Sequence, residues 1–116
     1  LAILVIARYW CAQFEWYAHA PMAISAGISA AAVAAIQINE KPNLDADDEH
    51  LVYDFVSELL ESHTVSQSTY DRAETTLGRR GVVDLVGIVG YYCLVSITLN
   101  VFEMPLPKGE VPPLSP

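Results

Sequence analysis

The stretch LVYDFVSELL, residues 51–60, carries the clearest structural signal in the chain. Its apolar side chains recur at i, i+1, i+4, i+5, i+8 and i+9, which places them on one face of an α-helix. Asp47, Asp48 and Glu49 precede it, where the helix dipole favours negative charge, and Asp45 is the predicted N-cap. The stretch predicts an amphipathic helix, and no strand-like alternation occurs anywhere in the chain.

Three further helices are expected before this stretch. Residues 1–13 are apolar on most sides, which is typical of a core or interface helix. Residues 15–26 continue helically, with Pro21 as a kink or restart and Gly27 as a left-handed cap. Ser29 is predicted to cap a short alanine-rich helix over residues 30–38, and a polar connection follows.

The second half of the chain predicts helices followed by an extended tail. Ser66 or Ser68 is expected to cap a helix that Gly78 closes, and residues 82–102 form a long apolar helix. Residues 105–116 hold five of the seven prolines and cannot form a helix or a central strand. We therefore expect an all-α domain of five to six helices over residues 1–104 and an extended proline-rich tail over residues 105–116.

Composition narrows the class of protein. At 116 residues the chain is a single domain, and 53% hydrophobic residues is high for a soluble chain of this size. A net charge of -8 argues against nucleic-acid binding, because few basic residues are present to neutralise phosphates. Cys11 and Cys93 form no Cys-x-x-Cys pair and read as free thiols of a reducing compartment, so we expect a cytoplasmic protein. Because Leu1 lies inside an apolar segment, we expect a further N-terminal part to precede it.

The last helix raises the question of a membrane. Residues 85–102 carry no charge and are 18 long, the lower edge of a spanning length. Polar side chains and Gly87 and Gly90 interrupt this run, and no basic cluster flanks it. We expect a helix buried between copies of the chain, with no membrane partner.

The stretch QFEWYAHAP, residues 13–21, holds the candidate catalytic pair. Glu15 and His19 are four residues apart and share one helical face. The pair could be an ordinary helix contact, or a proton carrier whose carboxylate orients the imidazole. Two ligands are too few for a metal, so we expect neither a metal site nor a cofactor. His50 and His63 are expected to be solvated or to cap helices.

Two long stretches resemble the carboxymuconolactone decarboxylase family, which includes the alkylhydroperoxidase D proteins. They are ILVIARYWCAQFEWYAHAPMAISAGIS, residues 3–29, and GVVDLVGIVGYYCLVSITLNVFEMPLP, residues 81–107. The matching features are the EW pair, the histidine four after the glutamate, the AGIS that follows, and the GYY and LN of the last helix. This resemblance implies an alkylhydroperoxidase D-like helical fold that assembles as dimers, trimers or hexamers.

The resemblance also divides the possible functions. Peroxidase members carry a Cys-x-x-Cys whose positions fall on Ala12 and Glu15 here, so that motif is absent. The decarboxylase branch fits better: His19 would be the general acid and base, and Glu15 would orient it. Trp16 and Tyr17 would line the pocket for a small lactone carboxylate.

The lyase hypothesis needs one more residue, and two alternatives to it remain. Arg8, two helical turns before Glu15 and on about the same helical face, is the candidate cation for the substrate carboxylate. A peroxidase using Cys11 is the variant within the enzyme class. A non-catalytic oligomeric member of the family is the third possibility.

Overall fold

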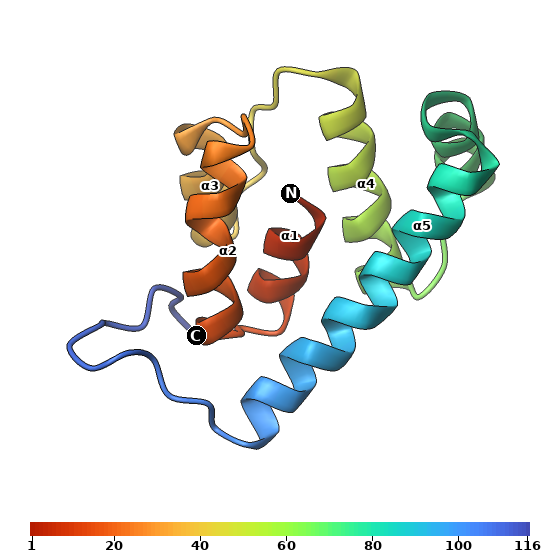
Figure 1. The fold of residues 1–116 in the computed structure, drawn as a ribbon. Helices are drawn as coiled ribbons and strands as arrows, with labels where there is room; N and C mark the ends of the chain where they lie inside the picture. Colours follow the sequence, from red (N-terminus) through yellow and green to blue (C-terminus); the bar gives the residue numbers. More distant parts are fainter.

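Helix α1, Ala2–Tyr9, occupies the centre of the structure because it is apolar on nearly every side. Leu4, Ile6 and Ala7 have no exposed surface, and α1 packs against each of the other four helices. In Figure 1, α1 lies between α2 and α3 on one side and α4 and α5 on the other. A helix only 8 residues long is marginal by itself, so these neighbours stabilise it.

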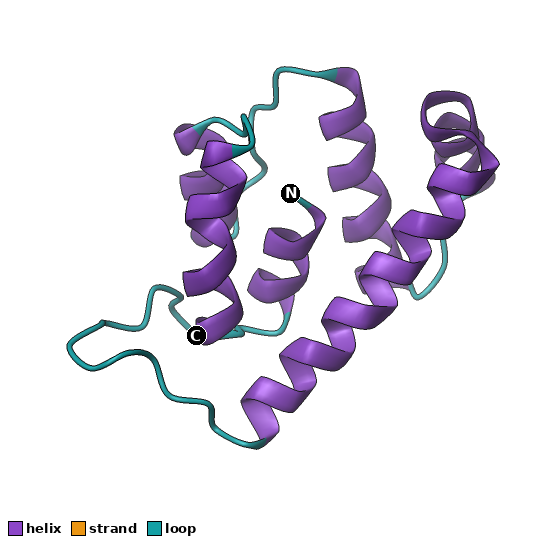
Figure 2. Ribbon diagram, in the orientation of Figure 1, coloured by secondary structure: helices purple, strands orange, loops and turns teal.

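The computed structural model describes all of residues 1–116 as a globule of five helices without strands, which confirms the all-α prediction. Figure 2 shows helices joined by loops throughout. The chain order after α1 is α2, α3, α4, α5, with these bounds: Gln13–Ser25, Ala30–Gln37, Asp47–Ser62 and Gln67–Val101.

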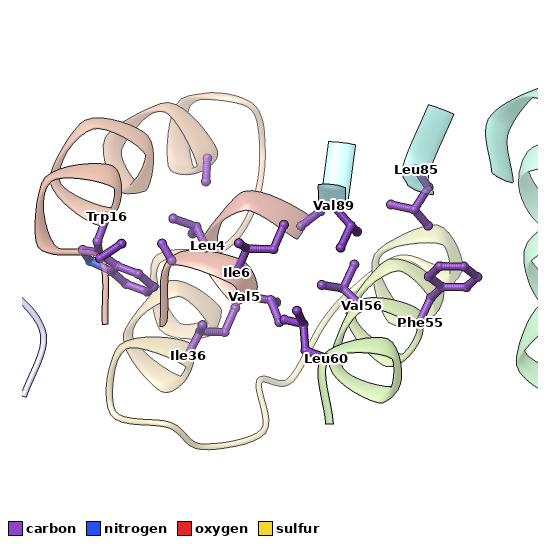
Figure 3. Close-up of a cluster of buried hydrophobic side chains, with 14 of the residues drawn as sticks. Leu4, Val5, Ile6, Trp16, Ile36, Phe55, Val56, Leu60, Leu85 and Val89 are labelled. Carbon is purple, nitrogen blue, oxygen red and sulfur yellow. The ribbon is translucent and has the colours of Figure 1, made fainter. Parts of the chain in front are cut away.

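One continuous hydrophobic core joins the five helices (Figure 3). Leu4 and Ile6 of α1 lie at its middle, Trp16 of α2 and Ile36 of α3 at one end, and α4 and α5 contribute the side chains at the other. The α4 members are the buried positions of the stretch that predicted the amphipathic helix: Leu51, Phe55, Val56 and Leu60.

Several predicted helix ends are confirmed. The Ser29 hydroxyl accepts a hydrogen bond from the Ala32 N–H at 3.1 Å, and Ser66 caps α5 in the same way. Gly27 follows α2 with a φ of 107°, a left-handed conformation that favours glycine. His63 ends α4 in a left-handed conformation and is exposed, as expected of a capping histidine.

Two predicted ends are wrong. The first helix stops at Tyr9 rather than near Gln13, because the chain turns at Cys11, whose φ is 49°. The N-cap of α4 is Ala46 and not Asp45. The Glu49 carboxylate reaches back and accepts hydrogen bonds from the Asp45 and Ala46 N–H groups, so an acid inside the first turn replaces the predicted cap.

Pro21 and Gly78 both lie inside helices, but only Gly78 interrupts its helix. Helix α2 runs through Pro21 without ending, although proline supplies no N–H for the helix ladder. Gly78, by contrast, has a φ of 71° and a ψ of 170°, so α5 consists of two helical parts joined by a kink. The predicted break at Gly78 is therefore confirmed.

The second part of α5 is less buried than expected. It is the one helix long and apolar enough to cross a membrane, and 22% of its most apolar window is buried within the chain. The exposed side chains recur every three or four residues, together with Gly87 and Gly90, and we call them the α5 stripe: Val83, Val86, Gly87, Gly90, Leu94, Ile97 and Val101. A single copy of the chain leaves this stripe uncovered.

Candidate functional site

Helices α2 and α5 meet along a polar line inside an otherwise apolar contact. Ser96 of α5 donates a hydrogen bond from its hydroxyl to Oε2 of Glu15 at 2.5 Å. One turn away, the ring of Tyr92 meets the ring of His19 edge to face, with 5.4 Å between the ring centroids. Glu15 and His19 therefore face α5 in the same register as Ser96 and Tyr92, with the two helices antiparallel. We call these four residues the α2–α5 seam.

Asn100 extends the same line by one more turn. Its side-chain amide donates a hydrogen bond to the Trp10 carbonyl oxygen at 2.7 Å. Positions 92, 96 and 100 are each four apart, so one face of α5 contacts α2 and the turn before it. This third contact fixes how far α5 can slide along α2.

Glu15 is the most deeply buried charged residue of the chain, with 2% of its surface exposed. Its second oxygen, Oε1, is buried and has no hydrogen-bond partner. Burial raises the pKa of Glu15 above its ordinary value of 4.5, and the hydrogen bond from Ser96 opposes this shift. The neutral acid is therefore favoured, because a protonated Oε1 avoids leaving a buried charge unpaired.

The pKa of His19 is shifted in the opposite direction to that of Glu15. His19 is half-buried, and burial lowers the pKa of the imidazole below its ordinary value of 6.5. Folding thus favours a neutral acid at Glu15 and a neutral base at His19, one helical turn apart. A direct proton transfer from one to the other would create a carboxylate and an imidazolium, and an apolar setting disfavours that charge separation.

The structure contains no hydrogen bond between Glu15 and His19. The carboxylate bonds Ser96 instead, so the predicted orienting bond is absent and Glu15 is linked to His19 by a shared helix face only. The two residues lie on the same helix face, but Glu15 does not fix the tautomer of the His19 imidazole.

Arg8 and Cys11 lie apart from the seam. The expectation that Arg8 shares a face with Glu15 assumed a continuous helix, and the turn at Cys11 breaks that register. The Arg8 guanidinium donates to the Ser115 carbonyl oxygen at 2.8 Å, and the Cys11 thiol lies 3.9 Å from the same guanidinium. Neither residue contacts Glu15 or His19 by a hydrogen bond.

The two predicted pocket walls have different surroundings. Trp16 is 3% exposed and belongs to the hydrophobic core, where it packs at one end of the cluster (Figure 3). Tyr17 is on the exposed side of α2. Trp16 therefore contributes to packing, and Tyr17 is accessible from solvent.

The three main cavities do not include Glu15 or His19. A cavity of about 290 Å³ lies one turn beyond the seam, lined by Gln13, Phe14, Leu99, Asn100, Glu103 and Met104. Another lies between α1 and α4 and includes Arg8, Tyr9 and Glu61. No group of three or more potential metal ligands comes together. Within one chain, Glu15 and His19 face α5 rather than a main cavity.

Ser96 and Tyr92 were not predicted as site residues. In the sequence they appear only as polar interruptions of an apolar helix. Their spacing of four, continued to Asn100, was the available signal, since it places all three on one face. Their partners on α2 could not be predicted, because the register between two helices is set by tertiary packing.

Comparisons with protein-family models, with curated proteins and with solved structures find no match to this chain.

The raised pKa of Glu15 predicts a pH-dependent stability. The folded state holds the Glu15 proton more tightly than the unfolded chain, so this contribution is complete below the ordinary pKa of 4.5 and is lost as pH rises through the folded-state pKa. Glu15→Gln should flatten this decline in the free energy of unfolding, measured by urea denaturation across pH.

Ser96→Ala provides the matched variant. The Ser96 hydroxyl favours the ionised carboxylate, so removing it should raise the folded-state pKa of Glu15 further. The decline in the free energy of unfolding should then occur at higher pH than in the wild type. Wild-type and Glu15→Gln proteins with parallel stability curves above pH 4.5 would contradict this assignment.

Proposed function

We propose that this protein is a cofactor-free lyase with an alkylhydroperoxidase D-like helical fold of the carboxymuconolactone decarboxylase type. Its substrates would be small lactone carboxylates, the oxidised products of ring cleavage. The observation that carries the proposal is the seam, where a buried Glu15 with one unpartnered oxygen shares a helix face with His19. The sequence resemblance supports the choice of reaction class.

The proposed reaction needs only a proton carrier and a polarised oxygen. The bond between the substrate carbon and its carboxylate carbon breaks, and carbon dioxide leaves. The electron pair of that bond delocalises into the lactone carbonyl and gives an enolate, which a hydrogen-bond donor stabilises. His19, after taking up a proton from solvent, delivers it to the carbon. No electron acceptor is required.

Two features of the pair suit this chemistry. Burial raises the pKa of Glu15, so this residue adds less negative charge beside His19 than an exposed glutamate would. His19 is half-buried, which leaves part of the imidazole accessible to a substrate. Tyr92, whose ring contacts His19, is the candidate donor to the enolate oxygen.

A peroxidase function through Cys11 has less support. Both cysteines are free thiols, and the Cys11 sulfur contacts Arg8, Gln13 and the Ser115 carbonyl rather than a second cysteine. A single thiol without a resolving partner cannot complete a disulfide cycle within the chain. The free thiols do support the proposed cytoplasmic location.

A non-catalytic oligomeric protein of the same fold is the second candidate. The observation in its favour is that neither Glu15 nor His19 lines a main cavity of the single chain. Under this function the seam would be structural, and its substitution would change stability without changing any turnover.

We also propose that the protein is a homo-oligomer assembled through the α5 stripe. The stripe spans about 27 Å of helix at 1.5 Å per residue, and Gly87 and Gly90 face open space, so a second helix can approach closely. The seam contacts of Ser96 and Asn100 lie within the same apolar segment. A bilayer around this segment would have to separate it from the helices that it contacts. This favours a protein partner over a membrane as the cover of the stripe.

His19→Ala tests the lyase. We expect turnover of a lactone carboxylate to fall by about 10²–10⁴-fold, the usual contribution of a general acid or base. Carbon dioxide release measures the rate, and sedimentation checks that the assembly persists. His63→Asn is the matched control, because asparagine tolerates the left-handed conformation of that exposed position. Undiminished turnover by His19→Ala would exclude the mechanism.

Leu94→Asp tests the assembly. Leu94 is 61% exposed in the middle of the stripe, so the new charge would be buried between copies. Burying unpaired like charges costs several kcal/mol, and association should weaken by about 100-fold or more. Sedimentation without detergent measures the effect, and Thr75→Asp, on the polar part of α5, is the control. Wild-type protein that sediments as a monomer would refute this interface.

A further inference from the structure

The last residues of the chain are held by a specific receptor. The Gln13 side chain pairs with the backbone of Leu114 in both directions: its Nε2 donates to the Leu114 carbonyl at 2.7 Å, and its Oε1 accepts from the Leu114 N–H at 2.9 Å. The Leu114 side chain is 3% exposed and joins the hydrophobic core. The Gln13 amide thus bonds both the N–H and the carbonyl of one backbone residue whose side chain is buried. This is how extended peptide segments are commonly bound.

Neighbouring donors complete this receptor. Gln37 Nε2 donates to the Pro113 carbonyl at 2.8 Å, and Arg8 donates to the Ser115 carbonyl at 2.8 Å. The Cys11 thiol also donates to the Ser115 carbonyl, at 3.7 Å, so three consecutive carbonyl oxygens each meet at least one side-chain donor. We call residues 113–115 the arm, and we call Arg8, Cys11, Gln13 and Gln37 the seat.

The linker before the arm has no comparable attachment. No hydrogen bond joins residues 105–112 to the helices, and the one backbone bond within them is from the Glu110 N–H to the Pro107 carbonyl. Nearly all of these residues are exposed. Figure 1 shows the linker as a wide loop that leaves the end of α5, projects away from the helices and returns beside the start of α2.

We propose that in the assembled protein the arm of one copy occupies the seat of a neighbouring copy. This inference rests on the homo-oligomer part of the proposed function. The contacts that hold the arm involve only residues 113–115 and the seat, and every copy carries both. An exchanged arm therefore keeps each of these hydrogen bonds and the buried Leu114.

The linker makes exchange geometrically accessible. Its nine steps from Met104 to Pro113 reach about 30 Å when extended, at 3.3–3.6 Å per residue. That reach exceeds the 21 Å short dimension of the chain. The linker also begins where the α5 stripe ends, next to the exposed Phe102 and Met104, so a copy packed on the stripe lies beside it.

The energetic balance also permits exchange. The advantage of the arm's own seat is only the entropy of closing a short loop, and Pro105, Pro107 and Pro112 stiffen that loop. Within an assembly, a neighbour's seat is available at an effective concentration on the order of millimolar. Among possible partners, a second copy is the one whose arm has the fitting chemistry.

Cross-linking between two distinguishable full-length chains tests this proposal. The first chain keeps Cys11 in its seat and carries Cys93→Ser. The second carries Cys11→Ser, Cys93→Ser and Ser115→Cys, with a tag that changes its mass. The chains are assembled together and treated with a short thiol-to-thiol cross-linker, and mass spectrometry identifies the linked peptides.

We expect a product that joins Cys11 of one chain to position 115 of the other. Its yield should exceed by about tenfold that of a control in which Glu110→Cys in the linker replaces Ser115→Cys. Leu114→Asp in the second chain should reduce the yield by a similar factor, because the leucine no longer anchors the arm.

A single chain with Cys93→Ser and Ser115→Cys supplies the reference for the arm's own seat. Internal cross-linking in that chain, with no product between the two different chains, would overturn exchange. Absence of both products would overturn it as well, because the arm would not be seated at all. Sedimentation of the same mixture is a separate readout, so an intact oligomer without exchange is distinguished from failure of the oligomer itself.

Discussion

Burial of α1 is the constraint on which the rest of the structure depends. An 8-residue apolar helix cannot persist in water, and it buries its surface only when the other four helices surround it. Leu4 and Ile6 are completely buried at that centre. Helices α2 and α5 both pack on α1, and they also contact each other. The polar seam is thus a consequence of how the apolar helix is enclosed.

The seam in turn links packing to chemistry. Because α1 holds α2 and α5 together, Glu15 cannot reach water, and Ser96 is its only hydrogen-bond partner. The same enclosure that stabilises the core therefore favours the protonated acid beside His19. The uncovered stripe lies on the same helix as Ser96 and Tyr92, but on a different face. Stability, assembly and the proposed proton transfer consequently depend on one helix.

Local signals predicted most of the helices and few of the contacts. The periodicity of residues 51–60 and the capping serines are properties of neighbouring residues, and both are confirmed. The turn at Cys11 was missed because no glycine or proline marks it, and this error placed Arg8 on the wrong face. The bond between Glu15 and Ser96 spans 81 positions, and the seat joins residues more than 70 apart. Such contacts depend on how helices align in space, which no local pattern specifies.

Folding raises the pKa of Glu15 and lowers the pKa of His19, and the proposed site depends on both shifts. The most direct measurement is a carbon NMR titration of the Glu15 side-chain carboxyl in the assembled protein, with Glu15→Gln used to assign its signal. We expect a midpoint above the ordinary value of 4.5, and a still higher midpoint in Ser96→Ala. A midpoint at or below 4.5 would show an ionised, solvated carboxylate and would contradict the proposed proton-transfer site.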